Sequence, residues 1–190
     1  MEKKKENPLR NKRVTDIAFA GIILAIMAIL NFVPNVGYIK IIPGAFEITI
    51  IHIFVIIFAW LLGWKAGLLS GIGFGLFCWA NAFIVGNPAF QNPLVSVLPR
   101  IFFGFIAGLS FDLTRLIKKP KVRYSVDVAL CALNTVVHTM LVLLMLYVDP
   151  TTEKETLAVY MKAMFVSMAI NFPVEVAAAT IIAPDRKSVV

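Results

Sequence analysis

The stretch VDVALCALNTVVHTMLVLLMLYV, residues 126–148, is apolar over a membrane-spanning length yet carries Asn134 and His138 near its centre. A helix that crosses a bilayer needs about 20 predominantly apolar residues. Residues four apart lie on the same face of a helix, so the asparagine and the histidine share one side. Polar groups inside a membrane are costly and usually face a protein interior or a water-filled cavity. The stretch therefore predicts a membrane helix with one polar face.

Further apolar stretches on both sides of it predict an all-α bundle of six transmembrane helices, which fills residues 1–190 as a single membrane domain. The chain is 59% hydrophobic and 15% charged, with a mean hydropathy of +0.85. A soluble domain has about 45–50% apolar and about 25% charged residues. The predicted spans are 14–33, 48–62, 67–85, 94–116, 126–148 and 159–183.

The basic residues predict the orientation. With six spans, fourteen of the 18 lysines and arginines fall on one side: in the N-terminal segment, at Lys65, in the 115–123 connection and in the C-terminal tail. Because cytoplasmic loops are enriched in lysine and arginine, both termini are expected in the cytoplasm. Topology thus accounts for the net charge of +7, and no nucleic-acid partner is expected.

A second polar pair, Asn171 and Glu175, lies four apart in the last predicted span. A buried carboxylate must be protonated, paired or hydrated. Pairing between His138 and Glu175 would meet that need and point to a binding pocket. The asparagines have an alternative role, in which they hold helices together by hydrogen bonds.

Other candidate ligand contacts lie near the predicted outer ends of the spans. Arg100 either extends to the membrane interface or uses its fork of donors to hold a carboxylate or phosphate. Asn81 ends the third span, and His52 is equally compatible with a cavity or with packing. Tyr38 and Lys40 lie in the apolar loop 34–47, which is expected to fold back as a plug or lid.

Small residues repeat every fourth position in three spans. Such faces let helices approach closely. Gly67, Gly71 and Gly75 are expected to pack within the molecule, as are Gly104 and Gly108. In the first span, the face formed by Ala18, Gly21, Ala25 and Ala28 is a candidate docking surface for a partner.

Catalytic and nucleotide-binding motifs are missing. The sequence has no P-loop, zinc-protease, nucleophile-elbow or dinucleotide motif, so no ATP hydrolysis is expected from this chain. Cys78 and Cys131 have no metal-ligand spacing and are expected to be inert thiols.

Three segments carry a resemblance to a known family: NPLVSVLPRIFFG at 92–104, ALNTVVHT at 132–139 and NFPVEVAAATIIAP at 171–184. With six spans and a small-residue first helix, the chain resembles the substrate-binding S components of energy-coupling-factor (ECF) vitamin transporters, in the branch that includes pantothenate transporters. The resemblance covers nearly the whole chain. The Gly21–Ala25 pair stands where the family often has two alanines.

The resemblance implies a multi-pass subunit of the cell membrane that binds a vitamin in an outward-facing pocket. Its partners would be a transmembrane coupling subunit and two ATPases, which use the ATP, while the chain itself holds no cofactor or metal. The face around Gly21 would be the docking surface. The implied pocket residues are Arg100, Asn134, His138, Asn171, Glu175, Asn81, Tyr38 and Lys40.

Pantothenate is the leading expectation, since Arg100 suits its carboxylate. Riboflavin remains an alternative, because aromatic residues are plentiful. Alternatives of another class are a small membrane enzyme that uses His138 and Glu175 as acid and base, and a standalone channel or carrier.

Overall fold

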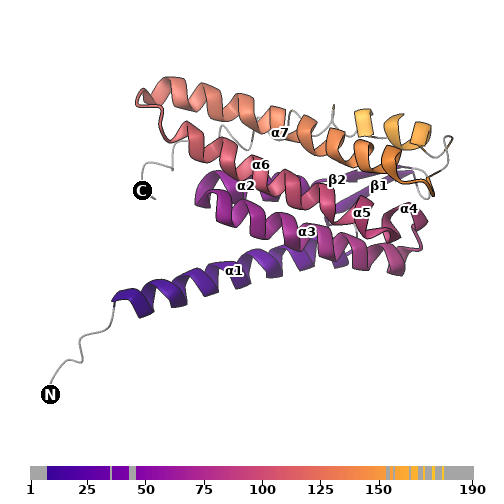
Figure 1. Ribbon diagram of the computed structural model, residues 1–190, viewed down its shortest axis with the longest axis horizontal. Coiled ribbons are helices and arrows are strands. Elements are labelled where there is room, and N and C mark those ends of the chain that lie inside the picture. Colours follow the sequence, from indigo (N-terminus) through magenta and orange to yellow (C-terminus); the bar gives the residue numbers. More distant parts are fainter. Residues whose placement is uncertain are drawn as a thin grey trace, which may run out of the picture.

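The computed structural model describes residues 8–34, 36–42 and 46–152, followed by short runs and single positions at 155, 157–162, 164–166, 169, 173 and 177. Its long elements are helices, which confirms the helical membrane class (Figure 1). The defined elements are α1 (Pro8–Phe32), β1 (Tyr38–Ile42), β2 (Phe46–Thr49), α2 (Ile51–Leu62), α3 (Trp64–Val85), α4 (Pro88–Gln91), α5 (Pro93–Ser96), α6 (Leu98–Thr114) and α7 (Pro120–Val148).

Four apolar segments are long enough to cross a membrane: Val14–Phe32, Trp64–Val85, Pro93–Thr114 and Pro120–Val148. They correspond to predicted spans 14–33, 67–85, 94–116 and 126–148. The predicted span 48–62 is wrong at its start, because residues 48 and 49 belong to β2 and the helix covers only Ile51–Leu62. Most of the predicted span 159–183 lies outside the described residues.

The loop expected to form a plug contains a two-stranded antiparallel β-hairpin. Tyr38 pairs with Thr49 and Lys40 with Glu47, and the register shifts between Lys40 and Ile42. The hairpin lies at one end of the bundle together with α4 and α5, which we call the hairpin end (Figure 1). The β-branched residues of both strands favour this extended pairing.

The opposite end holds the α2–α3 turn at Gly63 and the connection between α6 and α7, and we call it the basic end. Gly63 has a φ of +89°, a conformation that other residues rarely adopt. The Asp112 carboxylate of α6 accepts a hydrogen bond from the backbone amide of Trp64 at 3.0 Å. The two connections are therefore tied to each other.

Helices α3 and α6 pack backbone to backbone through their glycines. A methyl group added at Gly71 would lie 2.5 Å from the carbonyl oxygen of Arg100, and one at Gly67 would lie 2.6 Å from that of Gly104. Both distances are too short for a carbon atom, so only glycine fits. The predicted packing role of these faces is confirmed.

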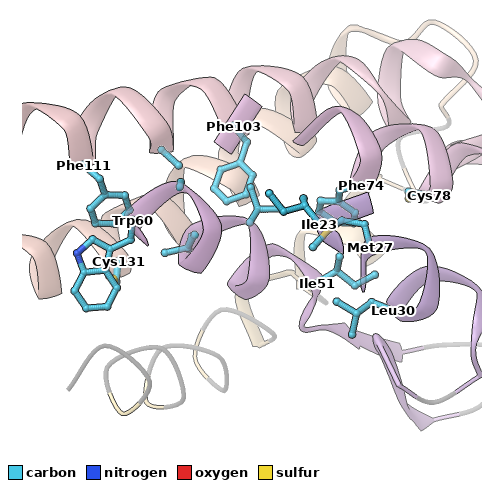
Figure 2. Close-up of a cluster of buried hydrophobic side chains, with 14 residues drawn as sticks. Ile23, Met27, Leu30, Ile51, Trp60, Phe74, Cys78, Phe103, Phe111 and Cys131 are labelled. Atoms are coloured by element: carbon cyan, nitrogen blue, oxygen red, sulfur yellow. The ribbon is translucent and has the colours of Figure 1, made fainter. Parts of the chain in front are cut away.

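The hydrophobic core runs along the bundle between α1, α2, α3, α6 and α7 (Figure 2). Trp60, Phe111 and Cys131 form one part of it, with the Trp60 and Phe111 ring centroids 6.1 Å apart. Met27 and Phe74 belong to another part, where α1 meets α3. The expectation that Cys78 and Cys131 are buried free thiols is confirmed.

Candidate functional site

Arg100 is buried at the start of α6, with only 5% of its surface exposed. Its guanidinium donates a hydrogen bond from Nη1 to the carbonyl oxygen of Val95 at 2.5 Å. The guanidinium carbon lies 5.4 Å from the ring centre of Phe74 and 5.2 Å from that of Phe90. Such contacts favour a cation, most strongly where water is displaced. Arg100 is therefore held inside the bundle at its hairpin end.

The Nε atom of Arg100 is buried and has no hydrogen-bond partner in the described part of the chain. Burying a charged donor without an acceptor is costly. An anionic ligand, or a group outside the described residues, would satisfy it.

Two histidines stack next to this arginine. The rings of His52 from α2 and His138 from α7 are nearly parallel, at 4°, with centroids 5.1 Å apart. The His138 ring also lies 5.7 Å from Phe74 and 4.8 Å from Phe103. Within the described chain the buried Nε2 of His138 has no hydrogen-bond partner. Aromatic rings and two buried polar atoms that have no hydrogen-bond partner among the described residues therefore meet between α2, α3, α6 and α7.

The Asn134 side chain links α7 to α6. Its Nδ2 donates to the Ser110 hydroxyl of α6 at 3.2 Å and to the backbone carbonyl of Leu130 at 2.9 Å. These bonds match the alternative in which a polar residue links two helices. Asn134 lies one turn from His138, on the side away from the hairpin end.

The other predicted site residues are described by the structure to different extents. The Tyr38 hydroxyl donates to the Asn31 side chain at 3.0 Å, which ties the hairpin to α1. Asn81 is half-buried in α3. Lys40 lies in β1, although its side chain is outside the described part of the chain. Asn171 and Glu175 also lie outside the described residues, so the His138–Glu175 pairing stays a prediction.

Helices α4 and α5 hold the segment in front of Arg100 in place. Trp79 of α3 donates from Nε1 to the Gln91 carbonyl at 2.8 Å, and the Ser96 hydroxyl donates to the Phe90 carbonyl.

At the end of α7, burial raises the pKa of Asp149, but hydrogen bonds from Thr151 and from the Asn92 and Thr152 side chains outweigh it. The pKa therefore lies below its ordinary value. The Asn92 bond joins α7 to the turn between α4 and α5.

The small-residue face of α1 points away from the bundle. Ala18, Gly21 and Ala25 are exposed and Ala28 is half-buried, while Met27 on another face packs against Gly73 of α3. A methyl group added at Gly21 would meet nothing within 4 Å. The face is therefore open to a partner or to lipid.

Several polar residues in the described chain were not among the predicted site residues. Asp127 is buried and accepts hydrogen bonds from Trp60 Nε1 at 3.0 Å and from the Thr114 hydroxyl at 2.6 Å. Arg123, four residues earlier, lies 4.0 Å from the same carboxylate. The i, i+4 spacing of Arg123 and Asp127 is the sequence pattern that could have identified this buried carboxylate. The described residues contain no group of three metal-ligating side chains.

The fold and the site define a multi-pass helical protein of the cell membrane, with a buried arginine among aromatic rings. A family model described as ECF transporter, substrate-specific component, matches residues 15–184, and the chain belongs to this family. The resemblance drawn from the sequence is confirmed. Because members of the family are transport components, the enzyme alternative is set aside.

A curated relative is the Pantothenate transporter PanT of Leuconostoc mesenteroides subsp. mesenteroides. It is 32% identical over 111 residues, an alignment that spans 55% of this chain and 54% of that protein. The chain is thus matched over about half the length of this relative.

Proposed function

We propose that this chain is the substrate-binding subunit for uptake of a carboxylated B-type vitamin, with pantothenate as the substrate. The observation that carries the proposal is the buried Arg100, whose Nε has no acceptor among the described residues. Pantothenate offers a carboxylate for this donor, and its hydroxyls and amide suit the His138 Nε2. The similarity to a pantothenate transporter supports the same substrate.

The aromatic side chains explain how a flexible, partly apolar molecule would be held. Phe74, Phe90 and Phe103 surround the arginine and His138 with apolar surface. Ligand sites are mostly apolar with a few well-placed polar groups. Riboflavin, the alternative, has no carboxylate, so it would leave the buried cation without a counter-charge.

The proposal includes the topology and the partners. Six spans would place both termini in the cytoplasm, with the hairpin end facing outward. Arg115 and Lys118 lie at the basic end, as this orientation requires. The vitamin would enter from the hairpin end, and transport would need a coupling subunit and two ATPases, because this chain carries no nucleotide-binding motif. The exposed face of α1 around Gly21 would be the docking surface.

Binding by the purified protein tests the proposal. Arg100→Ala should weaken pantothenate binding by about ten- to over a hundred-fold, because a hydrogen bond to a charged group contributes about 1.5–3 kcal/mol. Binding of the uncharged alcohol analogue, pantothenol, should change much less. Arg100→Lys is the matched control, since it keeps the charge but lacks Nε, and it should show an intermediate loss for pantothenate.

Equal weakening of the acid and the alcohol would contradict a carboxylate contact. Mass spectrometry of small molecules that co-purify with the unmodified protein provides an independent reading. Recovery of riboflavin in place of pantothenate would overturn the substrate assignment while leaving the transport role intact.

A further inference from the structure

Three lysines at the basic end form no ion pair within the described part of the chain. Lys118 and Lys119, in the connection between α6 and α7, and Lys121, in the first turn of α7, are exposed. Their basic neighbours differ: Arg115 lies 3.3 Å from the Asp112 carboxylate and Arg123 lies 4.0 Å from that of Asp127. In and beside the α6–α7 connection, the positive charge that remains available to a ligand is therefore concentrated on these three lysines, whereas Lys65, at the start of α3, lies 5.9 Å from the centre of the Trp64 ring.

Large apolar side chains are exposed beside these lysines. Leu113, at the end of α6, and Leu116, two residues beyond that helix, are 66% and 76% exposed. In water such exposure would be unfavourable, whereas in contact with acyl chains it costs nothing. A ligand that meets both the cations and the leucines must itself combine negative charge with hydrocarbon.

Two aromatic residues mark the level of the membrane interface at this end. Trp64, at the start of α3, and Tyr124, in the first turns of α7, are each 39% exposed. Tryptophan and tyrosine are enriched where the acyl chains meet the headgroups. The Asp112 carboxylate, near the end of α6, accepts a hydrogen bond from the backbone amide of Trp64 and so holds the start of α3 against α6. The lysines just beyond α6 are thus within reach of headgroup phosphates.

We infer that Lys118, Lys119 and Lys121, with Leu113 and Leu116, form a binding surface for anionic phospholipids. The lysines hold the headgroup phosphates and the leucines contact the first part of the acyl chains. A free phosphate or a nucleic acid would satisfy the charges but leave the leucines in water. Because the hydrogen bond between Trp64 and Asp112 joins the start of α3 to the end of α6, a lipid bound here would set the position of both helices along the membrane normal.

Quenching of tryptophan fluorescence by brominated lipids tests this inference in reconstituted protein. Trp64 lies at the basic end and Trp79 near the other end of α3. Trp79→Phe leaves Trp64 as the reporter, and Trp64→Phe leaves Trp79. The third tryptophan, Trp60, is buried and contributes a constant background in both.

At Trp64, brominated phosphatidylglycerol should quench at a several-fold lower membrane fraction than brominated phosphatidylcholine. Each lysine near an anionic surface contributes about fivefold. The triple variant Lys118→Gln, Lys119→Gln, Lys121→Gln should reduce this preference to less than about twofold. Replacing the same three lysines by arginine keeps the charge and should preserve the preference. The Trp79 reporter should show no preference.

Three results would overturn the inference. One is an unchanged preference in the triple glutamine variant. Another is loss of the preference for phosphatidylglycerol when Lys3, Lys4 and Lys5 are replaced by glutamine and the three lysines of the basic end are unchanged. That result would assign the lipid to the N-terminal segment. The third is competition by inorganic phosphate at constant ionic strength, which would identify a site for the free ion.

Discussion

Alanine at Gly104 should destabilise the bundle, whereas alanine at Gly21 should not. A methyl group at Gly104 would overlap the carbonyl oxygen of Gly67 and lie 2.9 Å from the Cα atom of Gly71. Both are backbone atoms of α3, which no side-chain rotation can move aside, so α3 and α6 would have to separate. The same change at Gly21 meets no atom within 4 Å.

The size of the effect follows from two opposing contributions. Overpacking in a close-packed interior costs about 1–3 kcal/mol, while alanine favours a helix over glycine by about 0.8–1 kcal/mol. Gly104→Ala should therefore lose up to about 2 kcal/mol of stability, and Gly21→Ala should gain up to about 1 kcal/mol. For a chain of this size 1 kcal/mol shifts Tm by about 2–4 °C.

Thermal unfolding of both variants and the unmodified protein, in one detergent and at one scan rate, measures the difference. We expect Tm to fall for Gly104→Ala and to stay level or rise for Gly21→Ala. Pantothenate binding should weaken in the first variant as well, because Arg100 lies one turn from Gly104 and its carbonyl oxygen contacts the Gly71 position. A Tm for Gly104→Ala at or above that of Gly21→Ala would refute the reasoning.

Two further predictions concern the outer face of α1 and the buried carboxylate at the basic end. Gly21→Leu should leave vitamin binding by the purified protein unchanged but lower uptake about fivefold or more in vesicles that contain the coupling subunit and ATPases, since overpacking a close contact costs about 1–3 kcal/mol. Unchanged uptake would show that this face does not dock. Asp127→Asn should lower stability by about 1–3 kcal/mol, because Trp60 and Thr114 donate to different oxygens of the carboxylate and asparagine replaces one of these oxygens by an NH2 donor. Thermal unfolding measures this loss, with Asp16→Asn, at an exposed position of α1, as the control that should not change. An equal Tm for the two aspartate variants would contradict a structural role for Asp127.

Hydropathy predicted the long helices well and their ends less well. The segment 48–62 is apolar throughout, so composition alone does not separate the end of β2 from the start of α2. Pairing with β1 decides that boundary, because strand pairing depends on a partner elsewhere in the chain. The break between α5 and α6 at Val97 is likewise a local geometry that hydropathy does not register.

The candidate site shows the same division. The sequence identified Arg100 and His138 as polar groups in apolar surroundings, and both are buried, Arg100 at the hairpin end and His138 farther from the end of α7. It treated His52 as equally suited to packing, whereas the structure stacks it on His138. Phe90 was not singled out, because a phenylalanine in a short loop has no helical period to place it.

By itself the sequence determined that this is a membrane protein, which faces of its helices are small, and that Asn134 and His138 share one face. Hydropathy and the helical period are local properties, so they fix which residues lie together on one helix. Only the tertiary structure decided what each face meets: Ser110 for Asn134, and the His52 and phenylalanine rings for His138. The reason is that the rotation of a helix and the choice of its neighbours depend on close packing between distant segments, here the glycine contacts of α3 and α6.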